Sequence, residues 1–230
     1  MKCRWLLLAL GAALYARAGG DGVAAQGGAQ ASATLQNPGT PWSRTRVYAC
    51  GDFEFVTRTG PGELALWLPR RYLVLSQVRS ASGAKYQEGD VVFWSKGAEA
   101  LLQVGDREYL GCRQQPERAL WADARRRGVS FRAVGNEPGW MLEILPGRQL
   151  VLVGDDGQLR LATPDPGAQE QGESRHYRAL TEAGELQVEI LQGACFDTVS
   201  GEAFPAVVTV SVNGRLLQGC GRELTPLVNP

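Results

Sequence analysis

The sequence has 230 residues, with 24 basic side chains, 24 acidic side chains and one histidine. This length suffices for one large or two small domains. The histidine, His176, lies in a polar stretch, which disfavours a Ser-His-Asp catalytic site. No histidine or cysteine spacing suits zinc, and no phosphate-binding glycine loop is present. We therefore expect a protein that is not an enzyme and that holds neither a metal ion nor a cofactor.

The N-terminal segment has the order of a secretory signal peptide. A short basic start precedes an apolar run from Trp5 to Leu14, and Ala16-Arg17-Ala18 has the small-x-small pattern of a cleavage site. The run is too short to span a membrane as a helix. No cysteine follows it, so the bacterial lipidation pattern is missing. The sequence predicts a signal peptide over residues 1–18 and a soluble periplasmic protein, without a lipid or membrane anchor, that begins near Gly19.

Removal of the predicted signal peptide changes two counts. The basic side chains fall to 21 against 24 acidic ones. A weakly acidic protein argues against nucleic acid or an anionic membrane surface as the main partner. The cysteines fall from five to four, and an even number in an exported chain implies disulfides. We predict the pairs Cys50–Cys112 and Cys195–Cys220, because each pair brackets its own block of sequence.

Residues 19–42 are mostly Gly, Ala, Gln, Ser and Thr, which predicts a flexible tether. The following block, residues 43–114, reads as β throughout. Short runs rich in β-branched, aromatic and alternating apolar residues are separated by glycine and proline at intervals of about 8–12 residues. They are Arg46–Cys50, Asp52–Thr57, Glu63–Leu68, Tyr72–Val78, Val91–Trp94, Ala98–Val104 and Arg107–Cys112. This pattern is typical of an antiparallel barrel or sandwich.

The last block, residues 115–230, is also rich in strand signals, so the fold class is all-β. Residues 117–127 form a polar stretch, for which we expect a single helical turn or an ordered linker. Asp156-Gly157 and Asn213-Gly214 predict hairpin turns, and residues 164–174 a surface loop. The expected strands are Val129–Val134, Trp140–Leu145, Leu150–Val153, Leu159–Ala162, Leu186–Leu191, Val207–Val212 and Leu216–Gln218.

The chemistry is concentrated in Ser80–Tyr86 and Val91–Gly97. Small residues from 80 to 84 cannot build a core, but they let a loop approach another surface closely. Gly97 marks a hairpin turn with Lys96 at its tip. Beyond the signal peptide the chain holds just two lysines, Lys85 and Lys96, against about ten times as many arginines. Either these are ordinary solvated lysines, or they serve a narrow site that a planar guanidinium would not enter.

The first block resembles the membrane-bound or periplasmic inhibitors of c-type lysozyme from Gram-negative bacteria. The resemblance covers about 65 residues and rests on Tyr48-Ala49-Cys50, Leu66–Pro69, Leu75–Val78, Ser80–Tyr86, Phe93–Gly97 and Cys112. It implies a small eight-stranded antiparallel barrel with one disulfide. It also implies that Ser82 and Lys96 enter the active site of a c-type lysozyme, which protects peptidoglycan. Ser80, Lys85 and Tyr86 belong to the same binding motif and frame the loop.

The chemistry of lysozyme suits such an insertion. The enzyme works with two carboxyl groups, one protonated and one ionised. A lysine ammonium in that cleft meets negative charge in a partly dry place, where a charge-assisted hydrogen bond is stronger than a surface ion pair. A serine hydroxyl donates and accepts, so it suits a carboxyl group in either protonation state.

The last block resembles a β-rich domain of bacterial envelope proteins without an assigned activity. This resemblance rests on residues 131–140, 195–205 and 219–222. Turn chemistry explains Asn136–Gly139, and it also explains Asp197, Ser200 and Glu202, although these could form a polar site. Glu137 and Asp197 could pair for sugar chemistry. The main alternative to an inhibitor is a periplasmic module that binds a small glycan or lipid fragment, for which a deep apolar pocket would be evidence.

Overall fold

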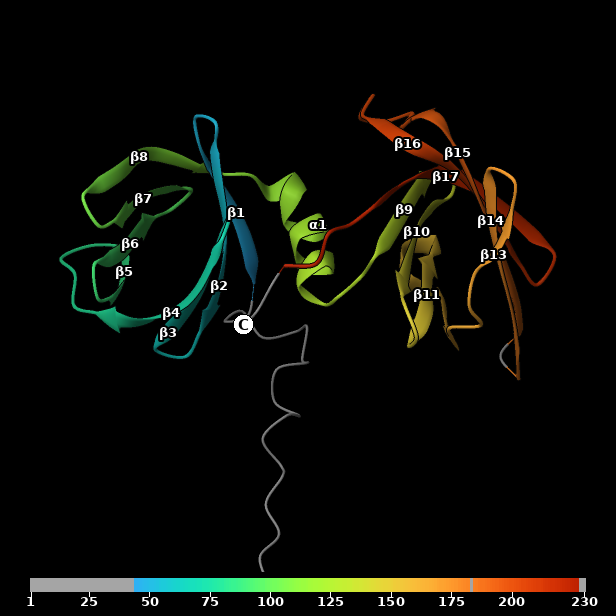
Figure 1. Cartoon of the computed structure of the whole chain (residues 1–230), viewed down its shortest axis with the longest axis horizontal. Coiled ribbons are helices and arrows are strands. Elements are labelled where there is room, and N and C mark those ends of the chain that lie inside the picture. The colour runs from blue at the N-terminus through green and yellow to red at the C-terminus, as the bar shows by residue number, and fades with distance from the viewer. Residues whose placement is uncertain (1–43, 183, 228–230) are drawn as a thin grey trace, which may run out of the picture. The chain divides into compact units, whose positions relative to one another are not determined.

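The computed structural model describes residues 44–182 and 184–227. The predicted signal peptide and most of the residues ahead of the first strand lie outside this part of the chain. The first eight strands form a closed antiparallel barrel in sequence order, with β8 returning to pair with β1 (Figure 1). The strands are β1 (Thr45–Cys50), β2 (Phe53–Gly60), β3 (Glu63–Leu68), β4 (Arg71–Val78), β5 (Ala84–Glu88), β6 (Val91–Lys96), β7 (Glu99–Val104) and β8 (Arg107–Gln114). The eight-stranded barrel expected from the resemblance is confirmed.

Alternation along the strands fills the barrel with side chains. On β3, for example, Leu64 and Leu66 point inward and are 0–1% exposed. Three aromatic rings, those of Tyr48, Phe55 and Phe93, lie within 6.0 Å of one another, centroid to centroid. The predicted Cys50–Cys112 disulfide is present and joins β1 to β8, where the barrel closes. The interior is therefore a packed core.

A helix follows the barrel where the sequence suggested a single turn or a linker. Helix α1 (Pro116–Arg126) is 11 residues long. Pro116 and Glu117 suit its first turn, and Arg125 and Arg126 suit its last turn. Its buried residues are the small Ala122 and Ala124, whereas its larger apolar side chains are exposed, as at Leu120, or half-buried, as at Trp121. The helix is longer than the single turn we expected, because a helix is recognised in a sequence by large apolar side chains that recur on its buried face.

The remaining strands form one antiparallel sheet of nine strands in the order β12-β11-β10-β9-β17-β16-β15-β14-β13 (Figure 1). They are β9 (Phe131–Asn136), β10 (Gly139–Leu145), β11 (Gln149–Gly154), β12 (Leu159–Pro164), β13 (Gln169–Gln171), β14 (Ser174–Thr181), β15 (Gly184–Phe196), β16 (Ala203–Val212) and β17 (Arg215–Glu223). Both predicted hairpin turns are found, Asp156-Gly157 within the short 3-10 turn Asp155–Gly157. The predicted loop at 164–174 contains the short strand β13, and the expected strands did not include β5 of the barrel or β14 of the second sheet.

The second sheet is curled around its own apolar cluster. The cluster includes Trp140, Leu142, Ile144, Ile190 and Val208, each at most 5% exposed. The predicted Cys195–Cys220 disulfide joins β15 to β17. No helix in the described part of the chain is long and apolar enough to cross a membrane. Within residues 44–182 and 184–227, no group of three or more His, Cys, Asp or Glu side chains is placed to hold a metal ion.

Candidate functional site

The loop that carries Ser82 and the hairpin that carries Lys96 lie at the same end of the barrel. The loop connects β4 to β5, and Lys96 is the last residue of β6 before the turn to β7. Because β5 pairs with β6 in the register Ala84 opposite Ser95, the end of the loop lies beside the end of the hairpin. Ser82 and Lys96 are both exposed. The structure thus brings together two residues that are 14 positions apart.

The serine loop is held by hydrogen bonds that its own small residues accept. The Ser80 hydroxyl lies 3.0 Å from the Ser82 carbonyl oxygen and 3.1 Å from the Gly83 carbonyl oxygen. The Trp94 indole N–H on β6 donates to the Ser82 carbonyl oxygen at 2.8 Å. The Ser82 side chain is exposed and has no hydrogen-bond partner among residues 44–182 and 184–227, so it can face another molecule.

The two lysines of this end differ in exposure. Lys96 is exposed at the tip of the hairpin, and Lys85 is half-buried on β5, opposite Trp94. Among the residues that the structure describes, neither ammonium group has an ion-pair partner. Glu99, which lies across the hairpin from Lys96, pairs instead with Arg113 at 3.3 Å. A carboxylate of another protein could therefore bind Lys96 without displacing an internal partner.

Tyr86 lies beneath this end of the barrel. Its side chain is 5% exposed and belongs to the barrel core, 6.3 Å from the ring of Phe93, and burial raises the pKa of its phenol. Burial also raises the pKa of Tyr48, although a nearby arginine and a hydrogen bond with Ser95 act against the rise. Tyr86 thus supports the loop from inside, whereas Ser82 and Lys96 are exposed to a partner.

The family whose model matches this chain is described as membrane-bound lysozyme-inhibitor of c-type lysozyme, and the match spans residues 48–110. The similarity to the inhibitor family thus lies in residues 48–110. They cover all but the ends of the barrel, so the candidate site lies wholly within the matched residues.

Two relatives carry the same description. A membrane-bound lysozyme inhibitor of C-type lysozyme from Yersinia enterocolitica is 34% identical over 76 residues, which are 32% of this chain and 65% of the relative. Its namesake from Escherichia coli K12 is 45% identical over 58 residues, which are 24% of this chain and 53% of the relative. The chain therefore spans less than two thirds of either relative. Both are named as inhibitors and not as enzymes.

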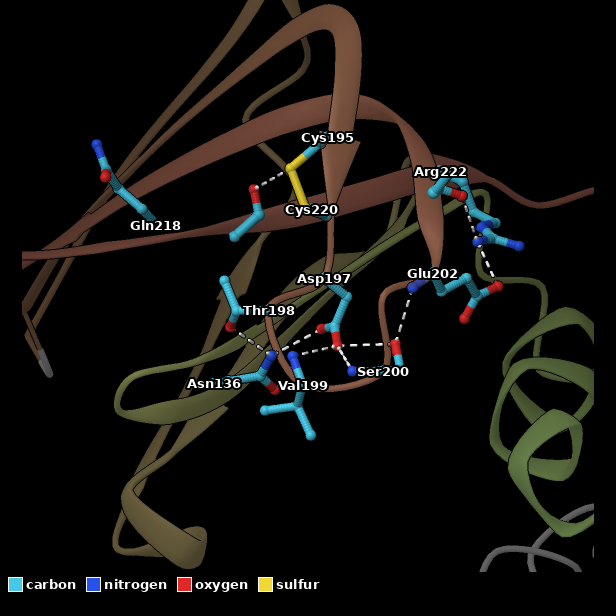
Figure 2. Close-up of a disulfide and its surroundings, with 12 residues drawn as sticks. Asn136, Cys195, Asp197, Thr198, Val199, Ser200, Glu202, Gln218, Cys220 and Arg222 are labelled. Carbon is cyan, nitrogen blue, oxygen red and sulfur yellow. Dashed lines mark hydrogen bonds and ion pairs between the residues drawn. A yellow bond between two sulfur atoms is a disulfide. The ribbon is translucent and has the colours of Figure 1, made fainter.

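The second sheet brings Asn136 of one sequence motif against the turn that Asp197 begins in another. Figure 2 shows Asn136, from the β9–β10 hairpin, pointing toward Asp197 in the β15–β16 loop. The Asn136 amide donates to Asp197 Oδ2 at 2.8 Å. Asp197 Oδ1 accepts from the backbone N–H groups of Val199 and Ser200 and from the Ser200 hydroxyl. Both carboxylate oxygens are thus occupied in holding the loop.

The sequence analysis missed the two residues that hold the serine loop on β6. In the sequence, Trp94 is one residue of the motif Phe93–Gly97 with no role of its own, and Gly83 is one of several small residues in the run from 80 to 84. The signal for Trp94 was its place two residues before Lys96, which puts both side chains on the outer face of the strand. No sequence rule could show that its indole reaches the carbonyl of Ser82.

Proposed function

We propose that this chain is an exported inhibitor of a c-type lysozyme and that Ser82 and Lys96 enter the active-site cleft of the enzyme. The observation that carries the proposal is the exposure of both side chains at one end of a barrel that matches the inhibitor family. Export through a cleaved signal peptide would bring the inhibitor to the periplasm, where peptidoglycan needs protection.

The exposed groups match the chemistry of the target. The lysine ammonium is directed to the ionised carboxylate, and the serine hydroxyl to the protonated carboxyl group. Removing one partner of a desolvated, hydrogen-bonded charge pair costs about 2–5 kcal/mol, part of it from the partner left unpaired. Lys96 should therefore contribute more than Ser82, whose hydroxyl should contribute about 1–3 kcal/mol.

The packed barrel counts against the alternative that its interior binds a small glycan or lipid fragment. A binding module of that kind needs an apolar cavity. Here the interior is filled by side chains that are at most 1% exposed: Phe55, Leu64, Leu66, Leu75, Val91, Phe93 and Leu102. A surface that reaches outward, as an inhibitor needs, fits this barrel better.

The test is residual activity of a c-type lysozyme against inhibitor concentration. We expect Lys96→Ala to weaken inhibition by about 30-fold or more and Ser82→Ala by about 5- to 150-fold. Lys96→Arg should also inhibit less well, because a planar guanidinium does not replace a compact ammonium in a narrow cleft. Arg107→Ala is the matched control, because Arg107 is an exposed cation at the opposite end of the barrel.

The stability of each variant decides how the inhibition data are interpreted. Both site residues are exposed, so the free energy of unfolding should change by no more than about 0.5 kcal/mol. A folded Lys96→Ala variant that inhibits as well as the wild type would show that insertion of Lys96 is not the mechanism. Inhibition lost equally in Arg107→Ala would point to a general charge effect.

A further inference from the structure

Trp94 links the two halves of the candidate site. Its side chain lies on the outer face of β6 and is 36% exposed, although a tryptophan is costly to leave in water. Its indole N–H donates to the Ser82 carbonyl oxygen, and Lys96 follows two residues later on the same face of the strand. One side chain therefore joins the backbone of the serine loop to the strand that ends at the lysine.

The backbone of the loop rests directly on β6. A Cβ atom built on Gly83 would lie 2.2 Å from the carbonyl oxygen of Ser95 and 3.2 Å from the indole nitrogen of Trp94. Such distances leave no room for a side chain. The absence of a side chain at Gly83 is what lets the Ser82 carbonyl come within reach of the indole.

The loop has few other means of holding a single shape. Residues 80–83 bury little apolar surface, and in the described part of the chain the Ser80 hydroxyl bonds within the loop alone. A loop of this kind loses conformational entropy when it binds unless something has already ordered it. The Trp94 hydrogen bond crosses from the loop to a barrel strand, so it can fix the position of Ser82 relative to Lys96.

We propose that Trp94 is a positioning residue that fixes the serine loop against the lysine hairpin before the partner binds. Its effect on inhibition rests on the function proposed above, whereas its effect on the loop does not. Trp94 lies outside the barrel core, whose aromatic members are Tyr48, Phe55, Tyr86 and Phe93. Loss of its N–H should therefore loosen the loop and leave the barrel folded.

The first measurement is hydrogen exchange of the backbone amides of residues 80–83 in the full chain. Trp94→Phe keeps an aromatic ring but removes the N–H donor together with the fused five-membered ring. We expect these amides to exchange about three- to tenfold faster in the variant, since a net hydrogen bond is worth roughly that factor. Amides of β2 and β3 should be unchanged. Trp140→Phe is the matched control, because the Trp140 indole also donates to a backbone carbonyl, that of Gln218, at 3.2 Å.

The second measurement is a double-mutant cycle on lysozyme inhibition. Trp94→Phe alone should weaken inhibition about three- to tenfold, and Trp140→Phe should leave it unchanged. In the Ser82→Ala background the penalty of Trp94→Phe should shrink to less than about twofold, because the hydroxyl that Trp94 positions is gone. A tryptophan that contacts lysozyme directly would keep its full penalty in that background.

The outcomes separate the two proposals. Unchanged exchange of residues 80–83 in Trp94→Phe would overturn the positioning role, whatever the inhibition data show. Faster exchange together with an inhibition penalty that persists in the Ser82→Ala background would show that Trp94 contacts lysozyme directly. That result would overturn the proposal that Trp94 acts on inhibition by positioning Ser82. If the wild-type chain inhibits no c-type lysozyme, the function proposed above fails, and the exchange measurement still decides whether Trp94 holds the loop.

Discussion

Gly83 is the residue at which the geometry of the candidate site is least tolerant of change. Gly83 has φ +69°, and several turn glycines have similar angles, between +62° and +72°. At Gly83, however, the backbone of Ser95 also occupies the space that a side chain would need. A left-handed backbone costs a non-glycine residue about 1–2 kcal/mol. Overpacking adds about 1–3 kcal/mol. The two costs can be separated with a second glycine that has only the first.

We predict that Gly83→Ala destabilises the chain by about 1–3 kcal/mol more than Gly89→Ala and also weakens lysozyme inhibition. Gly89 has φ +56° and no atom within 4 Å of a built Cβ, so its substitution carries the backbone strain alone. Urea unfolding and the inhibition assay measure the two effects. Equal losses of stability in both variants would mean that the loop moves away from β6 at little cost.

The carboxyl group of Asp197, in the β15–β16 loop of the second sheet, should titrate at acidic pH. Hydrogen bonds from the Ser200 backbone and hydroxyl, joined by Asn136 and Val199, lower the pKa of its carboxyl group to about 2. Because the folded pKa lies below the unfolded value of about 4, the stabilising effect is complete above pH 4 and is lost as pH falls through 2.

We therefore predict that the Ser200 amide resonance shifts with a midpoint near pH 2 and that the β15–β16 loop loosens over the range from about pH 4 to pH 2. An NMR titration of the wild type against Asp197→Asn measures this. The variant should show no transition at Ser200 in that range. A wild-type midpoint near pH 4 would contradict the hydrogen-bonded arrangement in Figure 2.

At the scale of elements, the sequence predicts the strands of the barrel better than it predicts the helix. Alternation on β3 and β6 is visible because each strand sends large residues inward, as with Leu64, Leu66 and Phe93. Helix α1 buries only alanines between its charged residues, so its pattern resembles a linker. β14 was missed because its inward residues, Tyr177 and Ala179, are flanked by polar and charged neighbours.

The site was predictable only in part for a related reason. Exposed Lys96 at a hairpin tip follows from the position of Gly97, which is local information. The hydrogen bond from Trp94 to Ser82 joins residues 12 positions apart, and it depends on the pairing register of β5 and β6. A one-residue change of that register would turn the indole to the other face of the sheet. A contact of this kind can be identified only from the folded barrel and not from the sequence.

Helix α1 also organises charges that the sequence analysis left unassigned. Asp123 accepts from the Thr45 hydroxyl at 2.7 Å and pairs with Arg58 on β2. A second carboxylate, that of Glu143 on β10, is buried and receives two hydrogen bonds from Arg127, at 2.6 and 2.7 Å. Arg127 also bonds to Asp123, so the two carboxylates are joined through one guanidinium. Asp123 of the helix is therefore bonded to β1 and β2 of the barrel, and Arg127, directly after the helix, is bonded to β10 of the second sheet.

At the scale of the whole chain, this bonding bears on where the inhibitor domain ends. The outer wall of the barrel has an apolar cluster of Val47, Val56 and Trp67, which Ala122 of α1 completes. A barrel cut after residue 114 would return this wall to water. Burial of one such valine is worth about 1.5–3 kcal/mol, so the loss is large beside the stability of a small domain. Helix α1 therefore covers the barrel wall with Ala122, while Ala124 on the same helix packs against Leu145 and Leu224 of the second block.

We predict that residues 43–128 form a more stable inhibitor than residues 43–114. Both fragments should inhibit lysozyme through Ser82 and Lys96, whereas residues 115–230 should not inhibit it. The longer fragment keeps Ala122 over Val47 and Val56 and the bond between Thr45 and Asp123, whereas the shorter one loses both. Urea unfolding should separate the two fragments by at least about 2 kcal/mol. Ala122→Asp in residues 43–128 is the internal control, because a carboxylate placed against the apolar wall should remove the stability that the helix adds.

Equal unfolding midpoints for the two fragments would show that α1 adds no stability to the barrel. Inhibition by residues 115–230 alone would show that the active surface lies outside the barrel.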